Sequence, residues 1–113
     1  QDETILPSLA QGGAQGGIGG TTNYNGRELV GIIEAWERGD LETAREKQNF
    51  SQAVINVICN YRGNIVGGKR IMKLIGLDLG QNRVPFRNMT DEEEASMKRE
   101  LEQIGFFERC NRF

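Results

Sequence analysis

Two adjacent carboxylates and a glycine run near the start of the chain have types and spacing that could serve chemistry. Asp2 and Glu3 stand side by side, and residues 12–20 read GGAQGGIGG, which holds six of the chain's 15 glycines. Since glycine has no Cβ, a ligand or a tightly packed neighbouring element can come close to such a backbone. This region is therefore the first candidate for a functional site.

The residues that most enzymes use for acid–base or metal chemistry are scarce. None of the 113 residues is a histidine, which excludes Ser-His-Asp and Cys-His catalysis and nearly every zinc site. Cys59 and Cys110 lie far apart with no other ligand type beside them, so free thiols are expected in preference to a disulfide. No metal and no cofactor is predicted.

Two glycine motifs match phosphate-binding loops in part and fail in detail. Residues 63–69, GNIVGGK, satisfy G-x-x-x-x-G-K, but Arg70 follows where a serine or threonine would bind magnesium. A dinucleotide fingerprint begun at Gly17 has Thr22 in place of its third glycine. We expect residues 63–69 to be a helix end followed by a turn.

Apolar residues at helical spacing predict that the first part of the chain is mostly α-helical. A short helix is predicted over residues 4–11, and residues 14–19 suit a buried strand as well as a loop. A longer helix, capped by Asn23 or Asn25, then runs to Gly39.

The second part of the chain predicts three more helices. One begins at Asp40 and runs to about Arg62, a shorter one covers residues 66–75, and the last begins at a capping box formed by Thr90 and Glu93. An extended segment around a proline separates the last two. The apolar positions are expected to be core or subunit contacts, among them Trp36, Phe50 and the three methionines.

Charge and hydropathy exclude several kinds of partner. A formal net charge of -2 gives no basic footprint for nucleic acid or an anionic membrane. No apolar run is long enough to span a bilayer, and the first residues lack the pattern of a signal peptide, so a cytoplasmic protein is expected. The chain begins with Gln1 rather than methionine, which indicates that the numbering starts inside a longer polypeptide.

The order of these segments fits the end of a barrel. A short strand ending in Gly19, Gly20 and Thr21, after an acidic pair on an earlier loop, is typical of the active face of a (β/α)8 barrel. The blocks DE, GGAQGGIGGTTNYN, AWERGDLETAREKQ and GGKRIMKLIGLDLGQNRVPF, followed by a capped helix, resemble the C-terminal part of the N-acetylneuraminate lyases, within the dihydrodipicolinate synthase superfamily. The resemblance implies an α/β fold. Residues 1–38 would be the last βα elements of a TIM barrel, from the end of strand 7 through helix 8, and residues 39–113 a C-terminal helical extension.

The resemblance also implies roles for five residues. Asp2 and Glu3 match the acidic pair that hydrogen-bonds the hydroxyls of the sugar, and Gly19 matches a glycine that the substrate passes closely. Gly20 stands where relatives commonly have a serine that touches a sugar hydroxyl, so that Thr21 or a water would have to replace this contact. The implied function is that of a Schiff-base aldolase that cleaves N-acetylneuraminate to N-acetylmannosamine and pyruvate, with this chain on the sugar-binding side and complete subunits in a homotetramer.

The catalytic residues of such an aldolase are expected outside this chain. The resemblance implies a Schiff-base lysine on the sixth strand, a tyrosine on the fifth and a Ser/Thr-containing loop near the N-terminal part, all before Gln1. The lysines present are predicted on helices or turns that would not desolvate an ammonium: Lys47, Lys69, Lys73 and Lys98. The chain alone is therefore predicted to be inactive and to need the missing N-terminal part as its partner.

Two other interpretations stay open. The chain could belong to another pyruvate-dependent enzyme of the superfamily, a dihydrodipicolinate synthase or a keto-sugar-acid aldolase, although the Asp2 and Glu3 pair favours the sialic acid branch. It could also be a non-catalytic helical interaction module, which predicts stable folding of the isolated chain. Against the module, an unpaired strand edge and exposed apolar faces would seek a partner.

Overall fold

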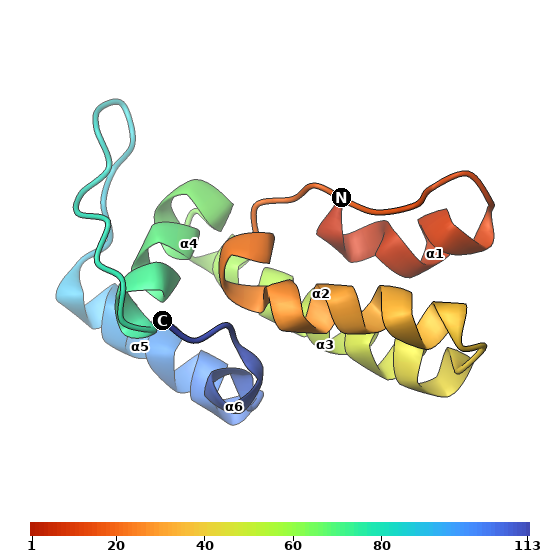
Figure 1. The fold of residues 1–113 in the computed structure, drawn as a ribbon. Coiled ribbons are helices and arrows are strands. Elements are labelled where there is room, and N and C mark those ends of the chain that lie inside the picture. Colours follow the sequence, from red (N-terminus) through yellow and green to blue (C-terminus); the bar gives the residue numbers. More distant parts are fainter.

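The computed structural model describes residues 1–113 as a set of helices joined by loops (Figure 1). A short 3-10 helix, η1 (Asp2–Thr4), holds the acidic pair expected on a loop, and the helix predicted over residues 4–11 is found as α1 (Ile5–Ala10). The remaining helices are α2 (Thr22–Glu37), α3 (Leu41–Asn60), α4 (Gly63–Leu74), α5 (Asp91–Gln103) and α6 (Phe106–Arg109). The molecule measures 43 × 28 × 24 Å, and none of its helices is both long and apolar enough to cross a membrane.

Helix α2 starts earlier than its sequence suggests. The predicted cap at Asn23 or Asn25 is wrong, because the helix begins at Thr22 and Thr21 stands at its N-cap. Asn25 lies inside the helix at a kink, with φ -116° and ψ 15°, and its amide donates a hydrogen bond to Oγ of Ser51 at 3.1 Å. The amide oxygen of Asn25, which a cap would use as its acceptor, is buried and accepts no hydrogen bond.

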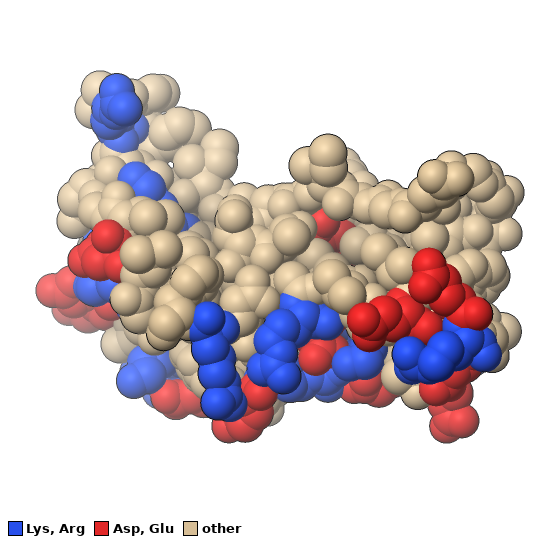
Figure 2. All heavy atoms as spheres, in the orientation of Figure 1, with Lys and Arg blue, Asp and Glu red and all other residues tan.

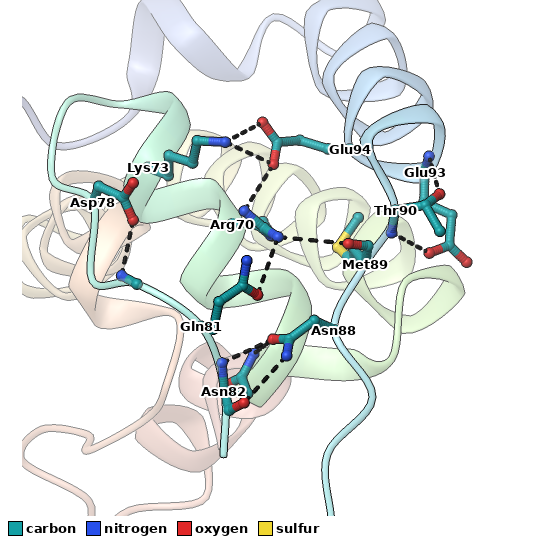
Figure 3. Close-up of polar contacts among 11 residues, drawn as sticks. Arg70, Lys73, Asp78, Gln81, Asn82, Asn88, Met89, Thr90, Glu93 and Glu94 are labelled. Carbon is teal, nitrogen blue, oxygen red and sulfur yellow. Dashed lines mark hydrogen bonds and ion pairs between the residues drawn. The ribbon is translucent and has the colours of Figure 1, made fainter. Parts of the chain in front are cut away.

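The starts of α3 and α5 confirm the predicted caps. The carboxylate of Asp40 accepts the backbone N–H of Thr43 at 3.1 Å. At α5 the Thr90 hydroxyl accepts the N–H of Glu93 at 3.2 Å, and the Glu93 carboxylate accepts the N–H of Thr90 at 2.9 Å (Figure 3). Both caps use side chains three residues from their donors, which is why the sequence predicts them well.

The GNIVGGK segment is helical and forms no phosphate loop. Helix α3 ends at Asn60, Arg62 adopts a left-handed conformation with φ 65°, and α4 begins at Gly63. The prediction of a helix end and turn over residues 63–69 is therefore wrong, as is the predicted start of the next helix at residue 66. The chain reverses in the two residues before Gly63, so the backbone N–H groups from residue 67 on are used inside the helix.

Two apolar clusters hold the helices together. The larger joins α2 through α6, and its fully buried side chains include Tyr24, Ile71, Met97 and Phe106. The smaller packs α1 against α2, and Trp36 lies partly buried beside it. Phe50 and all three methionines are buried, as predicted. Both cysteines are free thiols, also as predicted.

The loop between α4 and α5 projects from the body and is tied down at its base (Figures 1 and 3). Glu94 pairs with Arg70 at 3.2 Å and with Lys73 at 3.0 Å. Asn82 and Asn88 hydrogen-bond across the loop, with the Asn88 Oδ1 accepting the backbone N–H of Asn82 at 2.8 Å. These contacts fix the two ends of the loop beside α4 and α5.

The segment predicted as a strand or a loop, residues 14–19, is a loop in this chain. No strand is present, and residues 14–18 make no backbone hydrogen bond. Ile18 is 100% exposed, so the expected burial is not found. A strand exists only as part of a ladder, and this chain offers no second strand to pair with.

Candidate functional site

The five residues that the sequence singles out line one pocket of about 220 Å³. Asp2 and Glu3 come from η1, and Gly19, Gly20 and Thr21 come from the segment that enters α2. The rest of the wall is supplied by the start of the chain, by α3 and by α4: Gln1, Ile18, Ile55, Ile58, Cys59 and Asn64. Residues from four parts of the chain therefore meet at this pocket.

Asp2 is held from both sides. Only 5% of its surface is exposed, and its Oδ2 accepts the backbone N–H of Thr21 at 2.9 Å and also the Thr21 hydroxyl. Its backbone oxygen accepts Nε2 of Gln48 on α3 at 3.0 Å. A carboxylate at the first turn of α2 is also favoured by the helix dipole. The other carboxylate oxygen, Oδ1, has no hydrogen-bond donor from the chain.

Gly19 is required by the position of Asp2. A Cβ added at Gly19 would overlap the Asp2 carboxylate, so only glycine fits. The close approach predicted for this backbone is therefore found within the chain itself. The alternative of tight packing is not found at Gly12, Gly13 or Gly16, because nothing lies within 4 Å of a Cβ added there, and at Gly17 a Cβ would make ordinary contact with Ile5 of α1 at 3.6 Å. The first two of these glycines instead take positive φ angles at the end of α1.

Glu3 keeps its carboxylate free. It is partly exposed, lines the pocket, and accepts no hydrogen bond from the chain. Figure 2 shows most charged side chains along the edge of the molecule opposite the N-terminal segment, whose own side is largely uncharged. A free carboxylate on such a side is a strong acceptor for hydroxyl groups of a ligand.

Asn64 is a polar pocket residue that sequence reasoning missed. Its Oδ1 accepts the Tyr24 hydroxyl at 2.7 Å, and its Nδ2 occupies the space above Gly20 where a side chain would begin. Burial, and to a smaller extent the neighbouring Asp2 carboxylate, raise the pKa of the Tyr24 hydroxyl above its ordinary value, so this hydroxyl acts as the donor to Asn64. Asn64 lies inside GNIVGGK, and only its packing over Gly20 reveals its place.

This arrangement can bind a polar ligand and offers no lysine for a Schiff base. None of the four lysines lines the pocket. They lie on helices, as predicted, and Lys47 pairs with Glu28, Lys73 with Glu94 and Lys98 with Glu102. The chain contains no group of three or more side chains that could hold a metal ion.

Comparison with known proteins identifies the family. The model of the dihydrodipicolinate synthetase family matches residues 1–104. The chain belongs to this family. Among family members, the N-acetylneuraminate lyase of Rattus norvegicus is 33% identical over 106 residues, which cover 93% of this chain and 33% of that protein. The N-acetylneuraminate lyase of Clostridium perfringens is 38% identical over 97 residues, which cover 86% of this chain and 33% of that protein.

Solved structures of the family agree with this fold. The N-acetylneuraminate lyase of Proteus mirabilis superposes with a TM-score of 0.85 at 32% identity, over 94% of this chain and 35% of that structure. The lyase of Aliivibrio salmonicida gives a TM-score of 0.84 at 27% identity, with the same coverage. The chain thus spans about a third of the length of its relatives.

The family membership settles the fold class predicted from the sequence. The chain has the fold of the C-terminal part of a (β/α)8 TIM barrel with a helical extension, and it is itself mostly α-helical. The predicted division at residues 38 and 39 falls in the turn between α2 and α3. It stays a prediction, and the two parts share a core in which Tyr24 of α2 packs edge-on against Phe106 of α6, with ring centroids 6.2 Å apart.

Proposed function

We propose that this chain supplies the sugar-binding side of a class I aldolase that cleaves N-acetylneuraminate to N-acetylmannosamine and pyruvate. The observation that carries the proposal is the convergence of Asp2, Glu3, Gly19, Gly20 and Thr21 on one pocket of about 220 Å³. The similarity to N-acetylneuraminate lyases over most of the chain supports it. The ligands would be small molecules, sialic acid and pyruvate, and complete subunits would form a homotetramer.

The two carboxylates would share the recognition of the sugar. The carboxylate of Glu3 and Oδ1 of Asp2 have no donor from the chain, so both can accept hydroxyl groups of the substrate. Thr21 holds the other oxygen of Asp2 and fixes its direction. Gly19 allows that carboxylate to lie against the backbone.

The bond-breaking step would use residues outside this chain. In a Schiff-base aldolase a lysine amine attacks the keto carbon and water leaves, which gives a protonated imine that withdraws electrons. The carbon–carbon bond breaks as a sugar hydroxyl loses its proton, and the products are the sugar aldehyde and an enamine that hydrolyses to pyruvate. The polypeptide that supplies the rest of the barrel would provide this lysine.

Borohydride trapping tests the proposal. The protein, purified with every polypeptide that accompanies it, is treated with pyruvate and borohydride, and the intact masses are measured. We expect a reduced pyruvate adduct on the part of the enzyme that supplies the rest of the barrel, and none within residues 1–113. An adduct on this chain, or cleavage of N-acetylneuraminate by this chain alone, would contradict the proposed division of roles. If no polypeptide is labelled, the aldolase proposal fails and the non-catalytic interaction module becomes the better account.

In a second candidate function, the enzyme also forms a Schiff base with pyruvate but acts on a substrate other than N-acetylneuraminate. The matching family model is that of the dihydrodipicolinate synthetase family, which is broader than the lyases. Product analysis separates the two candidates. N-acetylmannosamine released from N-acetylneuraminate favours the lyase, whereas an adduct with pyruvate but no such release favours another pyruvate-dependent member.

A further inference from the structure

The pocket holds two carboxylate acceptors, and a sugar bound there would also need hydrogen-bond donors. The carboxylates of Asp2 and Glu3 can accept hydrogen bonds but, when ionised, cannot donate any. The hydroxyl of Thr21 is buried and already donates to Asp2. A sugar carries hydroxyl lone pairs and, in an acetamido group, a carbonyl oxygen, all of which need donors. Asn64 on α4 lines the same pocket, and its Nδ2 has no hydrogen-bond acceptor in the chain.

The amide of Asn64 is held in one orientation. Its Oδ1 accepts the Tyr24 hydroxyl at 2.7 Å, which leaves the NH2 group on the side of Gly20. A Cβ added at Gly68 would lie 2.8 Å from Oδ1, and a Cβ added at Gly20 would overlap Nδ2. The absence of side chains at Gly20 and Gly68 thus leaves room for this amide, and Tyr24 fixes its orientation.

We propose that Asn64 is a specificity-determining residue whose side-chain N–H donates to an oxygen of the sugar part of the substrate, in place of the side chain that Gly20 lacks. This inference rests on the proposed function, because it names the donor at the same site. It also accounts for the glycine at position 20. A serine there would displace the amide and break its bond to Tyr24, so Gly20 and Asn64 form a matched pair.

The substitution Asn64→Asp is the sharpest test. It keeps the shape of the side chain and the acceptor for Tyr24 but removes both N–H donors. In the assembled protein we expect KM for N-acetylneuraminate to rise about tenfold with kcat nearly unchanged, since the lost contact is made equally in the ground and transition states. Asn56→Asp is the matched control, because Asn56 lies exposed on α3 outside the pocket and its loss should leave KM unchanged.

A double-mutant cycle separates a donor role from a merely structural one. Asn64→Ala should also raise KM, and Gly20→Ser should raise KM when Asn64 is present because the two side chains collide. In the Asn64→Ala background the same Gly20→Ser change should lower KM, because the hydroxyl then has room and restores a donor. A purely structural role for Asn64 gives no such reversal.

The outcomes distinguish a failure of the Asn64 assignment from a failure of the proposed aldolase function. An active wild-type protein whose KM is the same in Asn64→Asp and Asn56→Asp, or a cycle without reversal, overturns the assignment of Asn64 alone. A wild-type protein that forms a pyruvate adduct but does not cleave N-acetylneuraminate, or forms no adduct, overturns the proposed function and this assignment with it.

Discussion

At the scale of single residues, the Asp2 carboxylate links the pocket to the start of α2. One of its oxygens is used by the backbone and the hydroxyl of Thr21, and the other is left for a ligand. The Asp2 side chain is therefore expected to contribute both to ligand binding and to stability. A change at Asp2 would remove the carboxylate itself, whereas a change at Thr21 keeps the carboxylate and removes one of the hydrogen bonds that fix it.

Thr21→Val should lower the free energy of unfolding by about 2 kcal/mol, because it removes a buried hydrogen bond to a charged group while keeping the side-chain shape. Urea denaturation followed by circular dichroism measures this change. Thr22→Val is the control: Thr22 is exposed and should cost less than about 0.5 kcal/mol. Equal losses in the two variants would mean that the Asp2–Thr21 contact contributes nothing to stability.

Glu93 gives stability that depends on pH. The ion pair with Arg62, together with the N–H of Thr90, lowers the pKa of Glu93 from 4.5 to about 2. A carboxyl whose pKa is lower in the folded state stabilises the protein above its unfolded pKa, and this contribution is lost as the pH falls from 4.5 toward 2.

Melting temperatures recorded between pH 6 and pH 2 test this contribution. The difference between wild type and Glu93→Gln should shrink over that window, since the glutamine cannot titrate. Glu92→Gln, at an exposed position without an ion pair, should run parallel to wild type. A constant difference between wild type and Glu93→Gln down to pH 2 would be inconsistent with the lowered pKa.

At the scale of elements, Arg109 connects the short helix α6 to the two long helices. Its guanidinium pairs with Glu28 of α2 and, at 2.6 Å, with Glu46 of α3, and it lies 3.8 Å from the centre of the Phe50 ring. Burial raises the pKa of Glu28, but its ion pairs with Arg109 and Lys47 outweigh this, so the net effect is a lowered pKa. The lowered pKa favours the ionised form of Glu28, which pairs with Arg109 of α6.

Arg109→Gln should destabilise the protein by on the order of 2 kcal/mol, because Glu28 would keep one cation instead of two and Phe50 would lose its cation–π contact. Lys98→Gln breaks an exposed pair at 3.8 Å and should cost about 0.5 kcal/mol at most. Thermal unfolding of both variants checks the contrast. If the two losses are alike, α6 is held by its apolar contacts alone.

The same elements show what local sequence can and cannot predict. The Asp40 cap and the capping box at Thr90 involve neighbours in the chain, and the sequence predicted both. Asn25 at the kink bonds to Ser51 of α3, and Arg62 in the turn after α3 pairs with Glu93 of α5. Both partners are distant in the chain, so local patterns missed these contacts. The resemblance brought out the acidic pair and Gly19, but not the amide that packs over Gly20 from α4.

At the scale of the whole molecule, the side of the chain that carries residues 14–19 has the features of a surface that pairs with another strand. It is largely uncharged (Figure 2), Ile18 is fully exposed on it, and the backbone of residues 14–18 has no hydrogen-bond partner. An extended segment with free N–H and C=O groups is a template for pairing with another strand. The barrel relatives are about three times as long as this chain, and we propose that the pairing strands belong to the part of the barrel outside residues 1–113.

Hydrogen–deuterium exchange of residues 14–18 would test whether this segment pairs with another strand. In the chain alone their amides should exchange within seconds, because none is hydrogen-bonded. In the assembled protein the neighbouring strands should protect several of them. Replacing Ile18 with Asp should weaken the assembly and return the segment to rapid exchange, because a charge would enter the new interface. Exchange in the assembled protein that matches the chain alone would instead mean that the segment stays a loop and that the partner, if it binds, does so through the helices.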